Sequence, residues 1–196
     1  MPFKVKEETL VSLFACYETP GQKLNWSSVF TLPVWLKSWW EIFGTDYQLC
    51  LHSVWLDEEL IGIAPLMRRG SEACLIGSPD VCDYLDFITI PGKEKEFLQG
   101  LLPELKMLGI ERLELSAQRP DAVIFKGYFI GTADFGCGCR GQFVPEDQSF
   151  ELKLYSTWED YLAGLAKKER HEIRRKLRRL KNEVKGYRYR VIGESG

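Results

Sequence analysis

The chain has 196 residues, of which 45% are hydrophobic and 13% are aromatic, so it can bury the core of one domain, or of one domain and part of another. Its formal net charge is −2, and no run approaches the ~20 consecutive apolar residues of a membrane-spanning helix. These features argue against a disordered chain and an integral membrane protein, and the short apolar run at residues 10–15 falls below the ~7 to 15 residues of a signal core, so we expect a cytoplasmic protein.

The first predicted helix spans residues 32–43. Thr31 precedes it as a candidate cap, Pro33 stands in its first turn and Gly44 follows its end. Three aromatic residues recur on one of its faces: Trp35, Trp39 and Phe43. An aromatic stripe at this spacing is typical of a face packed into the core.

The middle of the chain predicts a sheet with helices packed on it. Residues 47–55 and 60–69 are rich in strand-forming residues and flank a polar turn, which predicts a hairpin. Further strands are expected at 73–76, 84–90 and 111–116, and helical periodicity with Pro103 as its weak point predicts a helix at 93–108. We therefore expect a mixed α/β (α+β) fold with a largely antiparallel sheet flanked by helices.

Residues 117–145 are irregular and contain a GxGxxG pattern at 136–141. A dinucleotide-binding loop needs a helix that starts within the glycines, but residues 142–154 indicate loop and strand, so we expect a turn and no tightly bound cofactor. The cysteines are scattered without CxxC spacing, and the close pair Cys137 and Cys139 lacks two further ligands, so we expect reduced thiols and no metal. The six cysteines are Cys16, Cys50, Cys74, Cys82, Cys137 and Cys139.

A long basic helix is predicted to begin at the capping-box pattern of residues 156–159 and to stop at Gly186. Its apolar residues recur at helical spacing: Trp158, Tyr161, Leu162, Leu165, Ile173, Leu177, Leu180 and Val184. At ~1.5 Å per residue the helix would extend ~40 Å, so we expect it to bridge two packed bodies. Exposure of its apolar stripe would favour a homo-oligomer.

The charge of the chain is uneven. Residues 167–196 carry 12 Lys or Arg and 4 Glu, a net +8, which leaves 14 basic and 24 acidic groups, a net −10, for residues 1–166. Arg170, Arg174 and Arg178 recur at four-residue spacing and form one ridge of the predicted helix. Two interpretations remain open: the basic residues are solvated or paired with the acidic body, or they bind an anionic partner.

The segments from Ser156 to Leu162 and from Lys167 to Leu180 resemble the junction of the BioF2-like, or CelD-like, acetyltransferases of the GNAT superfamily, which are similar in plan to the FemAB aminoacyl transferases. The aromatic helix at 32–43, residues 60–66 of the second hairpin strand and residues 83–86 fit the same resemblance. It covers roughly residues 25–193.

The resemblance implies two GNAT-like lobes joined by a basic helix, with residues 1–155 as the N-terminal lobe and 156–196 as the helix and first strand that lead into a second lobe. It also implies that acyl-CoA, such as acetyl-CoA, serves as cosubstrate and binds mainly in that second lobe. The chain holds no [QR]xxGx[GA] acyl-CoA loop. We therefore expect the N-terminal part of an acyltransferase, incomplete and inactive by itself.

In this interpretation an acyl group passes to an amine or hydroxyl of a cell-envelope or polysaccharide precursor. Asp83 or Asp86 would position or deprotonate the nucleophile, and the alternative explanation for both aspartates is turn and strand-edge chemistry. Five basic residues would hold an anionic acceptor: Lys167, Arg170, Arg174, Arg175 and Arg178.

The alternative is a non-catalytic module whose basic helix binds an anionic surface or nucleic acid. No aromatic side chain interleaves with the arginines of the helix after Tyr161, so bases would lack a stacking platform and we do not expect nucleic acid as the partner. A third possibility is a structural lobe that docks on a separate catalytic chain.

Overall fold

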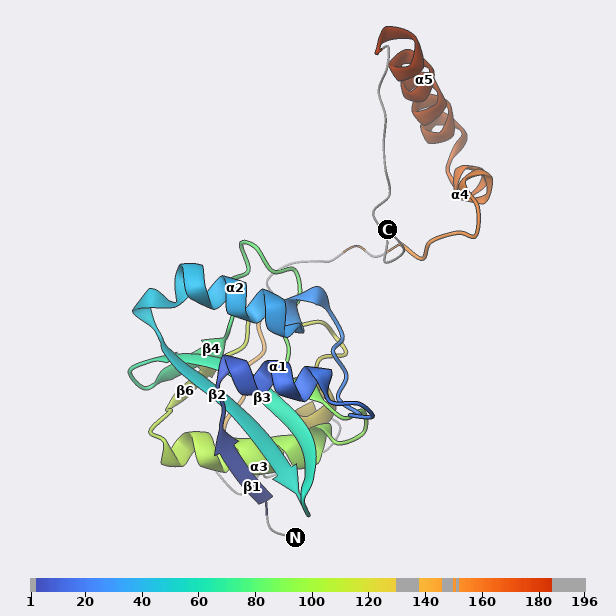
Figure 1. The fold of residues 1–196 in the computed structure, drawn as a ribbon. Coiled ribbons are helices and arrows are strands. Elements are labelled where there is room, and N and C mark those ends of the chain that lie inside the picture. Colours follow the sequence, from blue (N-terminus) through green and yellow to red (C-terminus); the bar gives the residue numbers. More distant parts are fainter. Residues whose placement is uncertain (1–2, 130–137, 146–149, 151, 185–196) are drawn as a thin grey trace. The chain divides into compact units, whose positions relative to one another are not determined.

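The computed structural model describes residues 3–129, 138–145, 150 and 152–184. The chain divides into two compact units, Met1–Gln142 and Phe143–Gly196, each of which is described by itself. The first unit is a mixed α/β fold with a largely antiparallel sheet, as the sequence predicts (Figure 1). None of the helices that the structure describes is both long enough and apolar enough to cross a membrane.

The sheet of the first unit has six strands in the order β1-β2-β3-β4-β6, with β5 paired to β3. The strands are β1 (Phe3–Glu7), β2 (Gln48–Leu56), β3 (Glu59–Arg69), β4 (Glu72–Leu75), β5 (Ile88–Thr89) and β6 (Arg112–Glu114). All neighbours are antiparallel except β4 and β6, which run parallel. Because β4 and β6 are parallel, the chain leaves both strands at the same end of the sheet, and the segments that follow them form part of the cavity described below.

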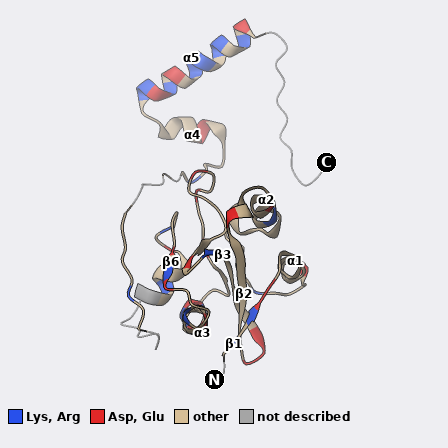
Figure 2. Ribbon diagram, turned by 90° about the vertical axis from the view of Figure 1, so that its left-hand side faces the viewer, with Lys and Arg blue, Asp and Glu red and all other residues tan. Residues whose placement is uncertain are grey.

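Helices cover both faces of the sheet. The helices α1 (Leu10–Glu18) and α2 (Pro33–Phe43) lie on one face, and α3 (Glu94–Met107) lies on the other (Figures 1 and 2). Because helices cover both faces of the central strands, these strands have continuous buried runs, as at residues 61–67 of β3. Short turns of 3₁₀-helix at Val29–Thr31 and Gly44–Asp46 and a π-helix at Phe125–Phe129 complete the unit.

The packing of α3 on the sheet centres on Phe97. This fully buried ring lies over Gly62 of β3, and its centroid is 5.3 Å from that of Phe87. A Cβ on Gly62 would stand 2.4 Å from the nearest Phe97 ring carbon, so the close approach of ring and strand requires glycine at this position. Phe87 in turn lines the pocket described below, so this contact joins the core to the site.

The predicted hairpin of β2 and β3 is confirmed, with Leu56 paired to Glu59 across a two-residue turn. Asp57 and Glu58 in that turn have φ values of 47° and 66°, the left-handed backbone that a type I′ turn needs. This conformation costs a residue with a Cβ roughly 1–2 kcal/mol, a cost that glycine avoids.

Replacing the turn by Asn-Gly (Asp57→Asn with Glu58→Gly) is expected to stabilise the protein by about 1 kcal/mol, because the new residues favour the required backbone. The urea midpoint measures the change, with an unchanged slope expected. Gly70 has a φ of 64° in the next turn and gives the opposite control, since Gly70→Ala should lower the midpoint. A lower midpoint for the Asn-Gly variant would contradict the prediction.

The predicted strand at 84–90 is wrong in extent, because only Ile88 and Thr89 pair with β3. β4 and β5 lie along the same edge of β3, with β4 opposite residues 66–69 and β5 opposite residues 62–63. Residues 77–87 leave this edge as an excursion between the two strands. The periodicity of the sequence did not reveal the excursion, because its buried residues pack on the core without joining the ladder.

Helix α2 begins and ends close to its predicted bounds, but its cap and its buried face differ from the prediction. The Thr31 hydroxyl donates to the Ser28 carbonyl oxygen at 2.8 Å, and Leu32 occupies the N-cap position without a side-chain bond. Of the aromatic stripe, Trp39 is buried, whereas Phe43 remains 53% exposed. The buried face is therefore rotated toward Leu36, which is 1% exposed.

The described residues of the second unit form two helices, α4 (Trp158–Gly164) and α5 (Lys167–Glu183), where the sequence predicted one. Leu165 and Ala166 between them are extended, and Glu169 accepts from the Ala166 N–H at 3.3 Å, which starts a new helix. The Tyr155 hydroxyl lies 2.6 Å from the place of a Cβ on Gly164, so the chain closes tightly where α4 ends. The basic helix is consequently 17 residues long.

Two further predictions fall on the connecting segment. The predicted strand within 142–154 is absent from the described residues of that range. Residues 136 and 137 of the GxGxxG pattern lie outside the described residues, and residues 138–141 have no regular structure.

Candidate functional site

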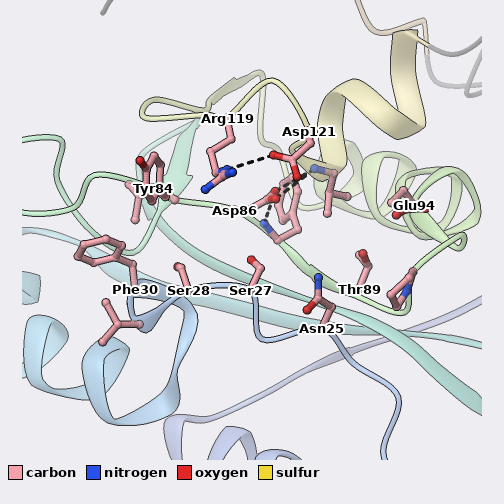
Figure 3. Close-up of a pocket in the computed structure, with 15 residues that line it drawn as sticks. Asn25, Ser27, Ser28, Phe30, Tyr84, Asp86, Thr89, Glu94, Arg119 and Asp121 are labelled. Atoms are coloured by element: carbon pink, nitrogen blue, oxygen red, sulfur yellow. Dashed lines mark hydrogen bonds and ion pairs between the residues drawn. The ribbon is translucent and has the colours of Figure 1, made fainter. Parts of the chain in front are cut away.

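A cavity of about 450 Å³ opens in the first unit between three segments of chain (Figure 3). The first segment, residues 25–30, precedes α2; the second, residues 84–94, contains the end of the excursion and the start of α3; the third, residues 119–123, follows β6. The residues that line the cavity are Asn25, Ser27, Ser28, Val29, Phe30, Tyr84, Leu85, Asp86, Phe87, Thr89, Pro91, Glu94, Arg119, Asp121 and Val123. The volume is in the range of small-molecule sites.

Backbone hydrogen bonds hold the three segments together. The Leu85 N–H donates to the Ala117 carbonyl at 3.1 Å, and the Gln118 side-chain amide donates to the Leu85 carbonyl. The Asn25 N–H donates to the Thr89 carbonyl at 2.9 Å. Two of the three segments follow the parallel strands β4 and β6 in the chain, and the cavity lies among them.

Asp86 is the central titratable group of the cavity. Its carboxylate accepts the Val123 N–H at 3.1 and 3.2 Å and the N–H of Phe87 at 2.8 Å. Burial raises the pKa of Asp86 to about 7, and these two backbone hydrogen bonds oppose the rise only in part. A carboxyl group that changes charge near neutral pH inside a pocket is a candidate for proton transfer.

Arg119 lies across the cavity from the serines. Its guanidinium donates to Asp121 at 3.1 Å and stacks over the Tyr84 ring, 4.8 Å from the centroid. Lys126 approaches the same Asp121 carboxylate at 3.9 Å. Asp121 is therefore held by two cations, while Asp86 faces the cavity with only backbone donors in the described structure.

Hydroxyl groups line the opposite wall. Figure 3 shows Ser27 and Ser28 pointing toward the side on which Asp86 and Arg119 lie. The Ser28 Oγ is shielded from solvent and has no hydrogen-bond partner within the described part of the chain. A buried hydroxyl without a partner is costly, so a ligand that bonds to it would gain affinity.

The structure separates the two aspartates that the sequence singled out. Asp86 lines the cavity, whereas Asp83 is exposed and lies outside the lining. The sequence did not single out Ser28, Arg119 or Asp121. The only signal for them was their position in loops before and after predicted elements, and their convergence depends on contacts between residues far apart in the chain.

The basic residues singled out in the sequence lie in the second unit, at the start and middle of α5, where Figure 2 shows both signs of charge along the helix. Several are paired locally: Arg174 with Glu159 of α4 at 3.0 Å, Arg175 with Glu172 at 2.7 Å, and the Arg170 guanidinium with the Ala163 carbonyl at 3.4 Å. The hydrogen bond from Arg175 lowers the pKa of Glu172. Lys167 and Arg178 are exposed, with no ion pair in the described structure.

The cysteines Cys16, Cys50 and Cys74 are partly or wholly buried. Burial raises the pKa of their thiols, which keeps these thiols protonated. Cys137 lies outside the described residues, and the part of the chain that is described holds no cluster of His, Cys, Asp and Glu suited to a metal ion.

The chain matches no protein-family model, no curated protein and no solved structure.

Proposed function

We propose that this chain is the acceptor-binding part of a GNAT-type acyltransferase that moves an acyl group from acyl-CoA to an amine or hydroxyl of a cell-envelope or polysaccharide precursor. The observation that carries the proposal is the position of Asp86 in the cavity. The pKa of its carboxyl group, about 7, suits a general base. The largely antiparallel sheet between helices, followed by a basic helix, supports the two-lobed plan that the resemblance implies.

In the proposed reaction the acceptor nitrogen or oxygen attacks the thioester carbonyl. The new bond joins that atom to the acyl carbon, the carbon–sulfur bond breaks, the acceptor proton passes to Asp86 and the thiolate of CoA leaves. Ser27 and Ser28 would orient the acceptor by hydrogen bonds. The acyl donor would bind mainly to the second lobe.

The test is acceptor-dependent release of free thiol from acetyl-CoA by the full-length protein that carries these residues, with hexosamines, polyamines and amino acids as acceptors. Loss of a general base should lower the rate of the Asp86→Asn variant by about 10² to 10⁴-fold. Asp46→Asn, which makes the same change at an exposed site, serves as the matched control. Wild-type rates in Asp86→Asn, or no thiol release with any acceptor, would refute the proposal.

A second candidate function is a non-catalytic anion-binding module that uses α5. Four exposed cations of this helix have no ion pair among the described residues: Lys167, Lys168, Arg178 and Lys181. Binding of a labelled oligonucleotide or of anionic vesicles that weakens steeply with salt would favour this function. Loss of acyl transfer in Asp86→Asn would favour the enzyme instead.

A further inference from the structure

The charges that line the cavity favour a cationic group. The lining holds three carboxylates, from Asp86, Glu94 and Asp121, and one guanidinium, that of Arg119, while Lys126 reaches Asp121 from outside the lining at 3.9 Å. The guanidinium is already engaged by Asp121 at 3.1 Å and by the Tyr84 ring. With Asp86 ionised, the lining is net negative, so an ammonium group would be attracted and a carboxylate or phosphate repelled.

The uncharged polar groups favour a ligand with several hydroxyls. Asn25, Ser27, Ser28 and Thr89 bring amide and hydroxyl groups from two segments to one wall of the cavity (Figure 3). The Ser28 hydroxyl has no hydrogen-bond partner in the described structure, so a ligand hydroxyl that bonds to it would offset the cost of leaving it unpaired. A simple alkylamine whose ammonium group is held by a carboxylate offers no further polar group, whereas a polyhydroxylated amine does.

The apolar part of the lining suits the carbon skeleton of such a ligand. Phe30 is half-buried and packs edge-to-face on Trp35, with ring centroids 5.2 Å apart. This contact fixes the Phe30 ring in the cavity lining, next to Ser28 (Figure 3). Phe87 and Val123 are buried on the Asp86 side. A cavity of about 450 Å³ has room for a small molecule.

We propose that this cavity binds a small polyhydroxylated amine of the amino-sugar class, with its ammonium group at Asp86 and its hydroxyls at Ser27, Ser28 and Thr89. The inference rests on the proposed function in one respect, the role of this ligand as the acyl acceptor. Binding itself requires no acyl donor, and the two proposals can therefore be tested separately.

The test is calorimetric titration of the chain with glucosamine, N-acetylglucosamine and glucuronate at about pH 7.5. Glucosamine should bind about tenfold or more tightly than N-acetylglucosamine, because acetylation removes the charge-assisted hydrogen bond to the Asp86 carboxylate. Glucuronate should not bind. Equal affinity for glucosamine and N-acetylglucosamine, or tighter binding of glucuronate, would overturn the inference.

Two variants assign the binding to the cavity. Asp86→Asn should weaken glucosamine binding by about tenfold, and Glu94→Gln, which removes a second negative charge from the lining, should weaken it less. Asp46→Asn changes the same group at an exposed position and should leave the affinity unchanged, with circular dichroism to verify that each variant folds. Binding that survives both cavity substitutions would place the ligand elsewhere and overturn the inference.

The outcomes separate the two proposals. Glucosamine binding that depends on Asp86, without acyl transfer to any acceptor, would support the inference and refute the proposed function. Acyl transfer to an amine that lacks hydroxyls, with no binding of glucosamine, would support the proposed function and refute the inference.

Discussion

The Asp86→Asn variant should be more stable than the wild type above pH 7, although it loses the proposed base. Folding raises the Asp86 pKa from 3.8 to about 7, so the folded state holds a proton that the unfolded state releases. The contribution of Asp86 to the free energy of unfolding is fully present below pH 3.8. It falls as the pH rises toward about 7 and stays low above that pH. The shift corresponds to about 4 kcal/mol, at about 1.4 kcal/mol per pKa unit.

Asparagine is neutral at every pH, and its Oδ1 can still accept the Val123 N–H. The difference in Tm between variant and wild type should therefore be small at about pH 4 and on the order of 10 °C at about pH 8.5. Thermal unfolding across this pH range measures it, with Asp46→Asn expected to follow the wild type throughout. A difference that does not change with pH would contradict the raised pKa.

Such a result would have a functional meaning. An ionised carboxyl group of this kind lowers the free energy of unfolding. Destabilising groups are typical of sites that act on a ligand. The predicted loss of acyl transfer in the same variant would complete the argument, because stability and activity would then change in opposite directions.

The Phe97→Ala variant is expected to lose about 3–5 kcal/mol of unfolding free energy, because the substitution empties a fully buried site between α3 and the sheet. Such a loss is a large share of the ~5–15 kcal/mol that stabilises a typical domain. Urea unfolding measures it. Phe43→Ala removes a ring that is 53% exposed and should cost far less, about 1 kcal/mol.

A double-mutant cycle tests the contact between Phe97 and Gly62. Gly62→Ala alone should cost about 1–3 kcal/mol, since its Cβ would meet two ring carbons at 2.4 and 2.8 Å. In the Phe97→Ala background that obstacle is absent, and the added methyl group should cost little or fill part of the cavity. We expect a coupling of about 1–3 kcal/mol, whereas additive effects would mean that ring and glycine do not touch.

Much of the architecture was readable from local sequence signals. The hairpin of β2 and β3, helix α2 and helix α3 follow from periodicity, turn residues and the glycines that end each element. The first strand and helix were missed, although Thr9 and Ser12 form a capping box that marks the start of α1. The break between α4 and α5 was missed because apolar spacing continues through Leu165, where the backbone is extended.

The sequence by itself determined the residue types of the site and the elements that surround it, and it identified Asp86 as a candidate beside Asp83. Only the tertiary structure distinguished the two aspartates, because the distinction depends on burial and on the backbone donors of Phe87 and Val123. The convergence of Arg119, Asp121 and Ser28 on one cavity likewise depends on hydrogen bonds between distant segments, such as those from Asn25 to Thr89 and from Leu85 to Ala117. Periodicity reports which face of an element is buried, whereas a binding site depends on which loops meet, and that is decided by long-range packing.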